Sequence, residues 1–147
     1  MALPPPEDAT AGDVESLMRR SLGFYHKHRY PEAKLLLEDA LCKSKQIGDC
    51  LLSSRVLGNL ANTCKELNDY DRSVRLYDEA LAGFSALGDN VRTGIILFNA
   101  AYTHKLLGRW EDVRRLMEKR LNMQGSPQEE DHKKAEALLE EANAQIA

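Results

Sequence analysis

The side chains best suited to catalysis or metal binding are four histidines, and their positions favour neither role. His26 and His28 lie two residues apart, so on a helix they point to different faces and cannot share one metal ion. His104 falls on an apolar helical stripe, where a hydrogen-bonded core histidine is a simpler interpretation than a metal ligand. His132 lies on the polar side of a charged helix, where water is expected to solvate it. No histidine has a nucleophile beside it at a spacing typical of covalent catalysis.

The other reactive groups give the same result. Cys42, Cys50 and Cys64 fit no metal-ligand spacing and are interpreted as reduced thiols, with Cys64 acting as a small apolar residue. Glycines occur singly or in Gly-Asp turns, without a phosphate-binding loop. Acidic residues over 129–131 and 140–141 suit helix capping and a solvated face. We therefore predict that the chain is not an enzyme, with no catalytic residue, no metal site and no cofactor.

The composition agrees with one ordinary domain. The 147 residues include 20 Lys and Arg against 23 Asp and Glu, a formal net charge of −3, with 43% hydrophobic and 29% charged residues. The longest apolar run, at 95–98, is far shorter than a membrane span. The acidic, proline-containing start has no export-signal pattern, so we expect a cytoplasmic location. The balance of charge gives no basic footprint, so no nucleic acid or membrane partner is expected.

A repeat of 40 residues organises the chain. Aromatic residues recur at this period, at Tyr30, Tyr70 and Trp110. The same register aligns leucines and small residues, at Leu17, Leu57 and Leu97, at Ser21, Ala61 and Ala101, and at Leu41, Leu81 and Leu121. Many positions that agree at one period indicate a repeat architecture.

Each repeat is predicted to contain two helices. In the second repeat, Val56, Leu60 and Cys64 follow helical spacing, and a turn at 68–70 leads to a second apolar stripe. Gly88 can adopt the left-handed conformation that ends a helix. The pattern predicts an all-α chain of three helix hairpins, over about 14–48, 50–88 and 90–123.

A seventh helix is predicted over 127–146. Ser126, Pro127 and Glu129 form a capping-box pattern with proline at the first helical position. Beyond them a single apolar stripe follows on a charged helix, at Ala135, Leu138, Leu139, Ala142 and Ile146. Stacked helical arrays need such a half-polar helix to cover their last apolar face. Residues 1–12, rich in proline and poor in apolar side chains, are expected to be a disordered tail.

This pattern resembles the tetratricopeptide repeat (TPR). Small residues at fixed places, an aromatic after the turn, and Ala33 and Ala40 in a second helix carry the resemblance over residues 14–123. It implies an α-solenoid of three TPR hairpins with a C-terminal capping helix. The Gly-Asp ends at 48–49 and 88–89, the 40-residue period and the Asn-Leu-Ala-Asn run at 59–62 resemble a narrower branch. That branch contains LGN/Pins spindle adaptors, rapsyn and ciliary TPR proteins.

The resemblance implies a concave groove lined by the first helix of each repeat. Its asparagines would bond a peptide backbone, its cations would select acidic side chains, and its aromatic residues would act as rigid anchors. The alternative is that individual members face water or a neighbouring helix. The predicted groove residues are Arg19, Tyr25, Arg55, Asn59, Asn62, Lys65, Phe98, Asn99, Tyr102 and Lys105.

A co-chaperone that grips the C-terminal carboxylates of Hsp70 or Hsp90 is disfavoured. The resemblance places the clamp cations and asparagines at five positions of this chain. They are occupied by Met18, Leu22, Asn59, Ile95 and Asn99, of which only Asn59 matches. Without the cations, a buried dicarboxylate would have little to neutralise it.

The resemblance thus implies an adaptor or scaffold that binds a peptide or helix of another protein in its groove. The alternative is a small structural subunit of a cytoskeletal or ciliary assembly. Partner and oligomeric state are not predicted. A basic cluster on the last hairpin has two interpretations, pairing with the acidic capping helix, which we favour, or a contact with an acidic partner. The cluster consists of Arg114, Arg115, Lys119 and Arg120.

Overall fold

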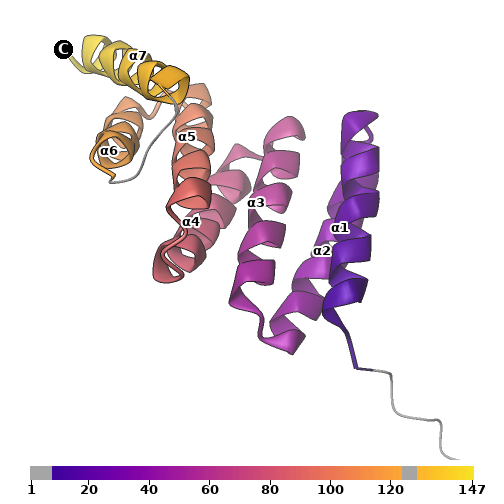
Figure 1. Ribbon diagram of the computed structural model, residues 1–147. Helices are drawn as coiled ribbons and strands as arrows, with labels where there is room; N and C mark the ends of the chain where they lie inside the picture. Colours follow the sequence, from indigo (N-terminus) through magenta and orange to yellow (C-terminus); the bar gives the residue numbers. More distant parts are fainter. Residues whose placement is uncertain (1–7, 124–128) are drawn as a thin grey trace, which may run out of the picture.

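The computed structural model describes residues 8–123 and 129–147, which form seven helices without a strand. The predicted all-α class and hairpin order are confirmed. The helices are α1 (Ala11–His26), α2 (Tyr30–Ile47), α3 (Cys50–Glu66), α4 (Tyr70–Ala86), α5 (Asn90–Leu106), α6 (Trp110–Leu121) and α7 (Glu129–Ile146). Figure 1 shows them following one another along an open array, with α1 at one end and α7 at the other.

Helix α1 begins earlier than the sequence predicts. Thr10 and Asp13 form a reciprocal capping box, with the Asp13 N–H donating to the Thr10 hydroxyl at 3.2 Å and the Thr10 N–H to the Asp13 carboxylate at 2.9 Å. The tail expected over 1–12 therefore overlaps the helix at Ala11 and Gly12. Residues 1–7 of that tail, and the predicted Ser126 and Pro127 cap of the last helix, lie outside the described residues.

The turns repeat at the same period as the helices. Between repeats, Gly48 and Gly88 have φ of 76° and 68°, and the next residues, Asp49 and Asp89, cap α3 and α5 with their side chains. Within repeats the left-handed position falls every 40 residues, at His28, Asn68 and Gly108. His28 thus serves as a turn residue.

The helices pack in chain order, each against the next, in two layers. Contacts also join α1 to α3 and α3 to α5, so these three form an inner layer, with α2, α4 and α6 outside (Figure 1). Large side chains such as Leu37, Leu60 and Leu97 are fully buried between the layers. Helix α7 packs on α6 and buries Ala135, Leu138 and Ala142, which confirms the predicted capping helix. No helix of residues 8–123 and 129–147 is long and apolar enough to cross a membrane.

Candidate peptide-binding groove

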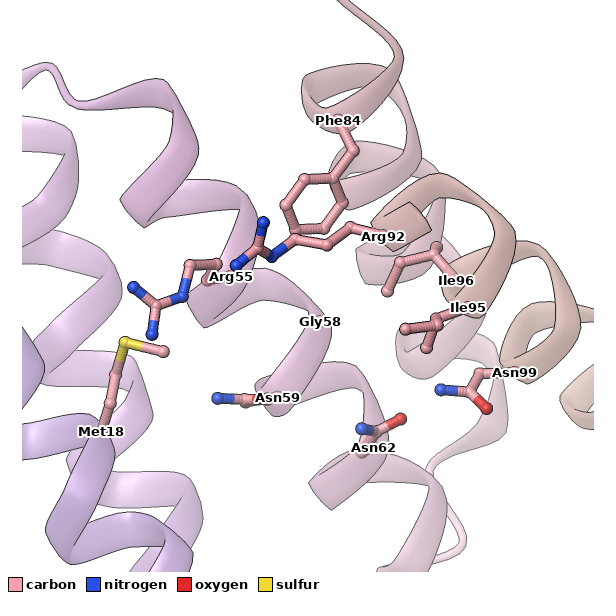
Figure 2. A pocket seen from close by; sticks show the side chains of 10 residues that line it. All are labelled: Met18, Arg55, Gly58, Asn59, Asn62, Phe84, Arg92, Ile95, Ile96 and Asn99. Carbon is pink, nitrogen blue, oxygen red and sulfur yellow. The ribbon is translucent and has the colours of Figure 1, made fainter. Parts of the chain in front are cut away.

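The inner layer is hollowed at its centre. A cavity of about 240 Å³ lies between α1, α3 and α5, with one wall from α4 (Figure 2). Its lining residues are Met18, Arg55, Gly58, Asn59, Asn62, Phe84, Arg92, Ile95, Ile96 and Asn99. Gly58 allows α5 to approach α3, because a Cβ there would lie 3.1 Å from the Ile96 Cδ1. We call this cavity the central hollow.

Two smaller hollows extend the central one along the array. A hollow of about 50 Å³ between α1 and α3 shares Asn59 and Asn62 with it. Another of about 160 Å³, between α5, α6 and α7, shares Ile95 and Asn99. Because the shared residues connect all three, they form one groove on the α1, α3 and α5 side of the molecule.

Three asparagines present amide groups to this groove. The Asn62 Oδ1 accepts a hydrogen bond from the buried Tyr77 hydroxyl of α4, which leaves its two N–H donors to face the groove. Asn59 and Asn99 are half-buried, and their side chains make no hydrogen bond with any described residue. These amides can pair with the N–H and C=O groups of a bound peptide backbone.

Two arginines line the other part of the central hollow. Arg92 donates from Nη1 to the Asp89 Oδ2 at 2.7 Å, and its backbone N–H donates to the Asp89 Oδ1 at 3.0 Å. These bonds, the backbone one first, lower the pKa of Asp89, so this carboxylate stays ionised and orients Arg92. Arg55 is half-buried and has no ion pair with any residue in the described part of the chain.

Tyr25 lines the hollow between α1 and α3. Its ring packs edge-on against Tyr30 at 5.2 Å between centroids, and its hydroxyl lies 3.5 Å from the Glu66 Oε1. Burial first, then the charge of Glu66, raises the pKa of Tyr25 to about 12. Tyr25 therefore remains neutral and can donate a hydrogen bond or act as an aromatic anchor.

Lysines flank an exposed tyrosine near the C-terminal ends of α3 and α5. The Lys65 and Lys105 Nζ atoms lie 5.8 Å and 5.7 Å from the Tyr102 ring centroid, within reach of a cation–π interaction. Lys105 also pairs with Glu141 of α7 at 2.9 Å. The capping helix thus holds Lys105.

The structure divides the predicted groove residues into two groups. Six line the three hollows, namely Tyr25, Arg55, Asn59, Asn62, Phe98 and Asn99. Four line none of them, namely Arg19, Lys65, Tyr102 and Lys105. Arg92 was not predicted as a groove residue. The sequence does contain a signal for Arg92. Asp89 precedes it by three residues at the start of α5, a spacing that places a carboxylate and a guanidinium on the same helical turn.

Outside the groove, the structure corrects the expected hydrogen bonding of His104 and confirms the burial of Cys64. His104 is buried as predicted, but its Nδ1 makes no hydrogen bond and lies 3.7 Å from the Asp112 Oδ2. Burial is the main reason why the pKa of His104 is lowered. Cys64 is buried, and burial raises the pKa of its thiol. Within residues 8–123 and 129–147, no group of His, Cys, Asp and Glu side chains is arranged to hold a metal ion.

Among the side chains that the structure describes, the basic cluster of the last hairpin makes no ion pair with the capping helix, the interpretation favoured above. Arg114 pairs with Glu111 at 2.7 Å and Arg115 with Asp112 at 3.2 Å, all within α6. Partners one turn away on the same helix are reached at a lower entropic cost than partners on α7. Arg120 instead lies over Gly94 of α5, where a Cβ would come within 2.9 Å of its Nε, and it lines the hollow between α5, α6 and α7.

Stacked helical hairpins with a groove on their inner layer define an α-solenoid. The profile of the tetratricopeptide repeat matches residues 52–126, just over half of the chain. The chain belongs to the tetratricopeptide repeat family. No curated protein sequence matches it significantly.

Solved structures share the fold. The Yersinia enterocolitica type III secretion chaperone SycD, solved in complex with a peptide of the translocator YopD, has a TM-score of 0.76 at 14% identity, over 94% of this chain and 98% of that one. BtubC (BKLC) from P. vanneervenii has a TM-score of 0.72 at 19% identity, over 90% of this chain. This chain spans 63% of BtubC.

Proposed function

We propose that the chain is a non-enzymatic adaptor that binds a segment of another protein in its groove. One observation carries the proposal, namely the half-buried side chains of Asn59 and Asn99, which have no hydrogen-bond partner among the described residues. Polar groups in a partly desolvated hollow gain most from a ligand that completes their hydrogen bonds. The similar chaperone SycD was solved with a bound peptide, which supports the same use of the fold here.

The groove suits recognition of a peptide backbone. Each asparagine amide offers two donors and one acceptor, which match the repeating C=O and N–H groups of an extended chain. Asn62 is held by Tyr77, so part of the conformational cost of binding is already met. Contacts with the peptide backbone give affinity that does not depend on the sequence of the peptide. The arginines and the apolar walls of the groove select among peptide side chains.

The proposal also includes a cytoplasmic location and membership of the branch with LGN/Pins, rapsyn and ciliary TPR proteins. The Asn59–Asn62 run supports this branch, because both residues line the groove. The Gly-Asp ends support it less. Gly48 and Gly88 end helices in the left-handed conformation, while Asp49 and Asp89 cap the next ones, and any solenoid needs those two functions.

The test is a selection from a phage-displayed library of random peptides of about 12 residues, long enough to cross the groove. We expect the wild type to enrich peptides, and Asn59→Ala with Asn99→Ala to weaken their affinity by about tenfold or more. Asn143→Ala, at an exposed position of α7, is the matched control and should bind normally. Failure to enrich any peptide, or equal affinity of the double variant, would contradict the proposal.

A further inference from the structure

The central hollow carries a positive charge that the described residues do not compensate. Arg55 and Arg92 line it, and none of its ten lining residues is acidic. Asp89 neutralises Arg92 through an ion pair at 2.7 Å. Arg55 has neither an ion pair nor a side-chain hydrogen bond among residues 8–123 and 129–147. One full positive charge therefore remains in a partly buried cavity, where it is poorly screened.

The lysines beside Tyr102 lie outside the three hollows, and one of them is already paired. Lys105, on one side of the Tyr102 ring, pairs with Glu141 of α7 at 2.9 Å. Within the central hollow, the attraction for an anionic ligand is concentrated at the two arginines.

The geometry around these arginines suits a carboxylate. Figure 2 shows both guanidinium groups extending in the same direction, toward the α1 side of the hollow where Met18 lies. The Asp89 contacts fix Arg92 through Nη1 and leave its other N–H groups available. A guanidinium presents parallel N–H donors that match the two oxygens of a carboxylate. Apolar side chains of Met18, Phe84 and Ile96 line the same cavity and exclude water from part of it.

We propose that Arg55 and Arg92 form a subsite that binds the side-chain carboxylate of an Asp or Glu in the segment held by the groove. This inference rests on the proposed function and names the chemistry of the partner. The central hollow adjoins another hollow on each side. It shares Asn59 and Asn62 with the hollow between α1 and α3, and Ile95 and Asn99 with the hollow between α5, α6 and α7. A bound chain can therefore continue in both directions, which favours an internal acidic residue over a chain terminus.

The peptide selection described above tests the subsite when it is repeated with Arg55→Gln. We expect the wild type to enrich peptides with Asp or Glu at one aligned position and Arg55→Gln to lose that preference. Arg75→Gln is the matched control, because Arg75 is exposed on the outer helix α4 and the substitution removes the same charge. The control should keep the acidic preference.

A double-mutant cycle then tests direct contact between the acidic residue and Arg55. Replacing the aligned Glu of a selected peptide by Gln should weaken binding to the wild type by about tenfold, and should change binding to Arg55→Gln far less. Circular dichroism melting of each variant checks that it is folded. Enriched peptides without an acidic preference, or equal losses in both backgrounds, would overturn the subsite and leave the adaptor proposal standing. Failure to enrich any peptide would overturn both.

Discussion

His104 shows how a single buried imidazole makes the stability of the chain depend on pH. Burial disfavours its cation, and so do Arg109 and Arg115, whereas Asp112 and Asp78 favour it. The sum of these effects lowers the pKa of His104 below its usual value of 6.5. The unfolded chain therefore takes up the proton first as the pH falls. The free energy of unfolding decreases from about that pH downward, until the folded form is protonated as well.

We expect His104→Leu to remove this dependence, because a leucine of similar size fills the site without titrating. The measurement is urea unfolding of both proteins at several values between about pH 8 and about pH 5, the range in which histidine titrates. The stability of the wild type should fall more steeply than that of the variant. His26→Gln, at an exposed position, serves as the control and should follow the wild type. Parallel curves for wild type and His104→Leu would contradict this account.

Close contact between helices depends on glycine at particular positions. A Cβ at Gly83 of α4 would lie 1.9 Å from the Ser54 Oγ and 3.1 Å from its Cβ, on α3. A Cβ at Gly23 of α1 would meet nothing within 4 Å. The same substitution should therefore have opposite effects at these two helical positions, through overpacking at one and improved helix propensity at the other.

We expect Gly83→Ala to lower the free energy of unfolding by about 1–3 kcal/mol, and Gly23→Ala to raise it by up to about 1 kcal/mol. Chemical denaturation measures both. Adding Ser54→Ala to Gly83→Ala removes the clashing oxygen and should restore part of the loss. If Gly83→Ala were as stable as the wild type, α3 and α4 would be packed less closely than described.

The helices themselves follow from local patterns in the sequence. The hairpins are determined by the 40-residue period, by the turn residues at fixed positions within it and by apolar stripes of helical spacing. Every repeat buries its apolar stripes against its neighbours in the same way. The same register placed Arg55, Asn59 and Asn62 in the groove. Contacts between helices were not predictable in this way. The Tyr77 hydroxyl reaches Asn62 from another helix, and such a contact depends on three-dimensional distance that local spacing does not give.

At the scale of the whole molecule, a solenoid distributes its stability between neighbours. Each helix packs mainly on the one before and the one after it, and α7 packs chiefly on α6. Loss of one terminal interface should therefore destabilise only the helices next to it and should leave the distant hairpins folded. The groove lies mostly between α1, α3 and α5, so its central part should survive loss of the capping helix.

Leu138→Asp tests this independence, because it places a charge at a buried position of α7. Docking of α7 should weaken by about 2–4 kcal/mol, the loss expected for an apolar contact replaced by a poorly solvated carboxylate. Amide hydrogen exchange should show lost protection in α7 and α6, with α1 to α4 almost unchanged. Ala137→Asp adds the same charge at an exposed neighbouring position and should leave every helix protected. A uniform loss of protection from α1 to α7 would mean instead that the array unfolds as one cooperative unit, with the capping helix stabilising even the first hairpin.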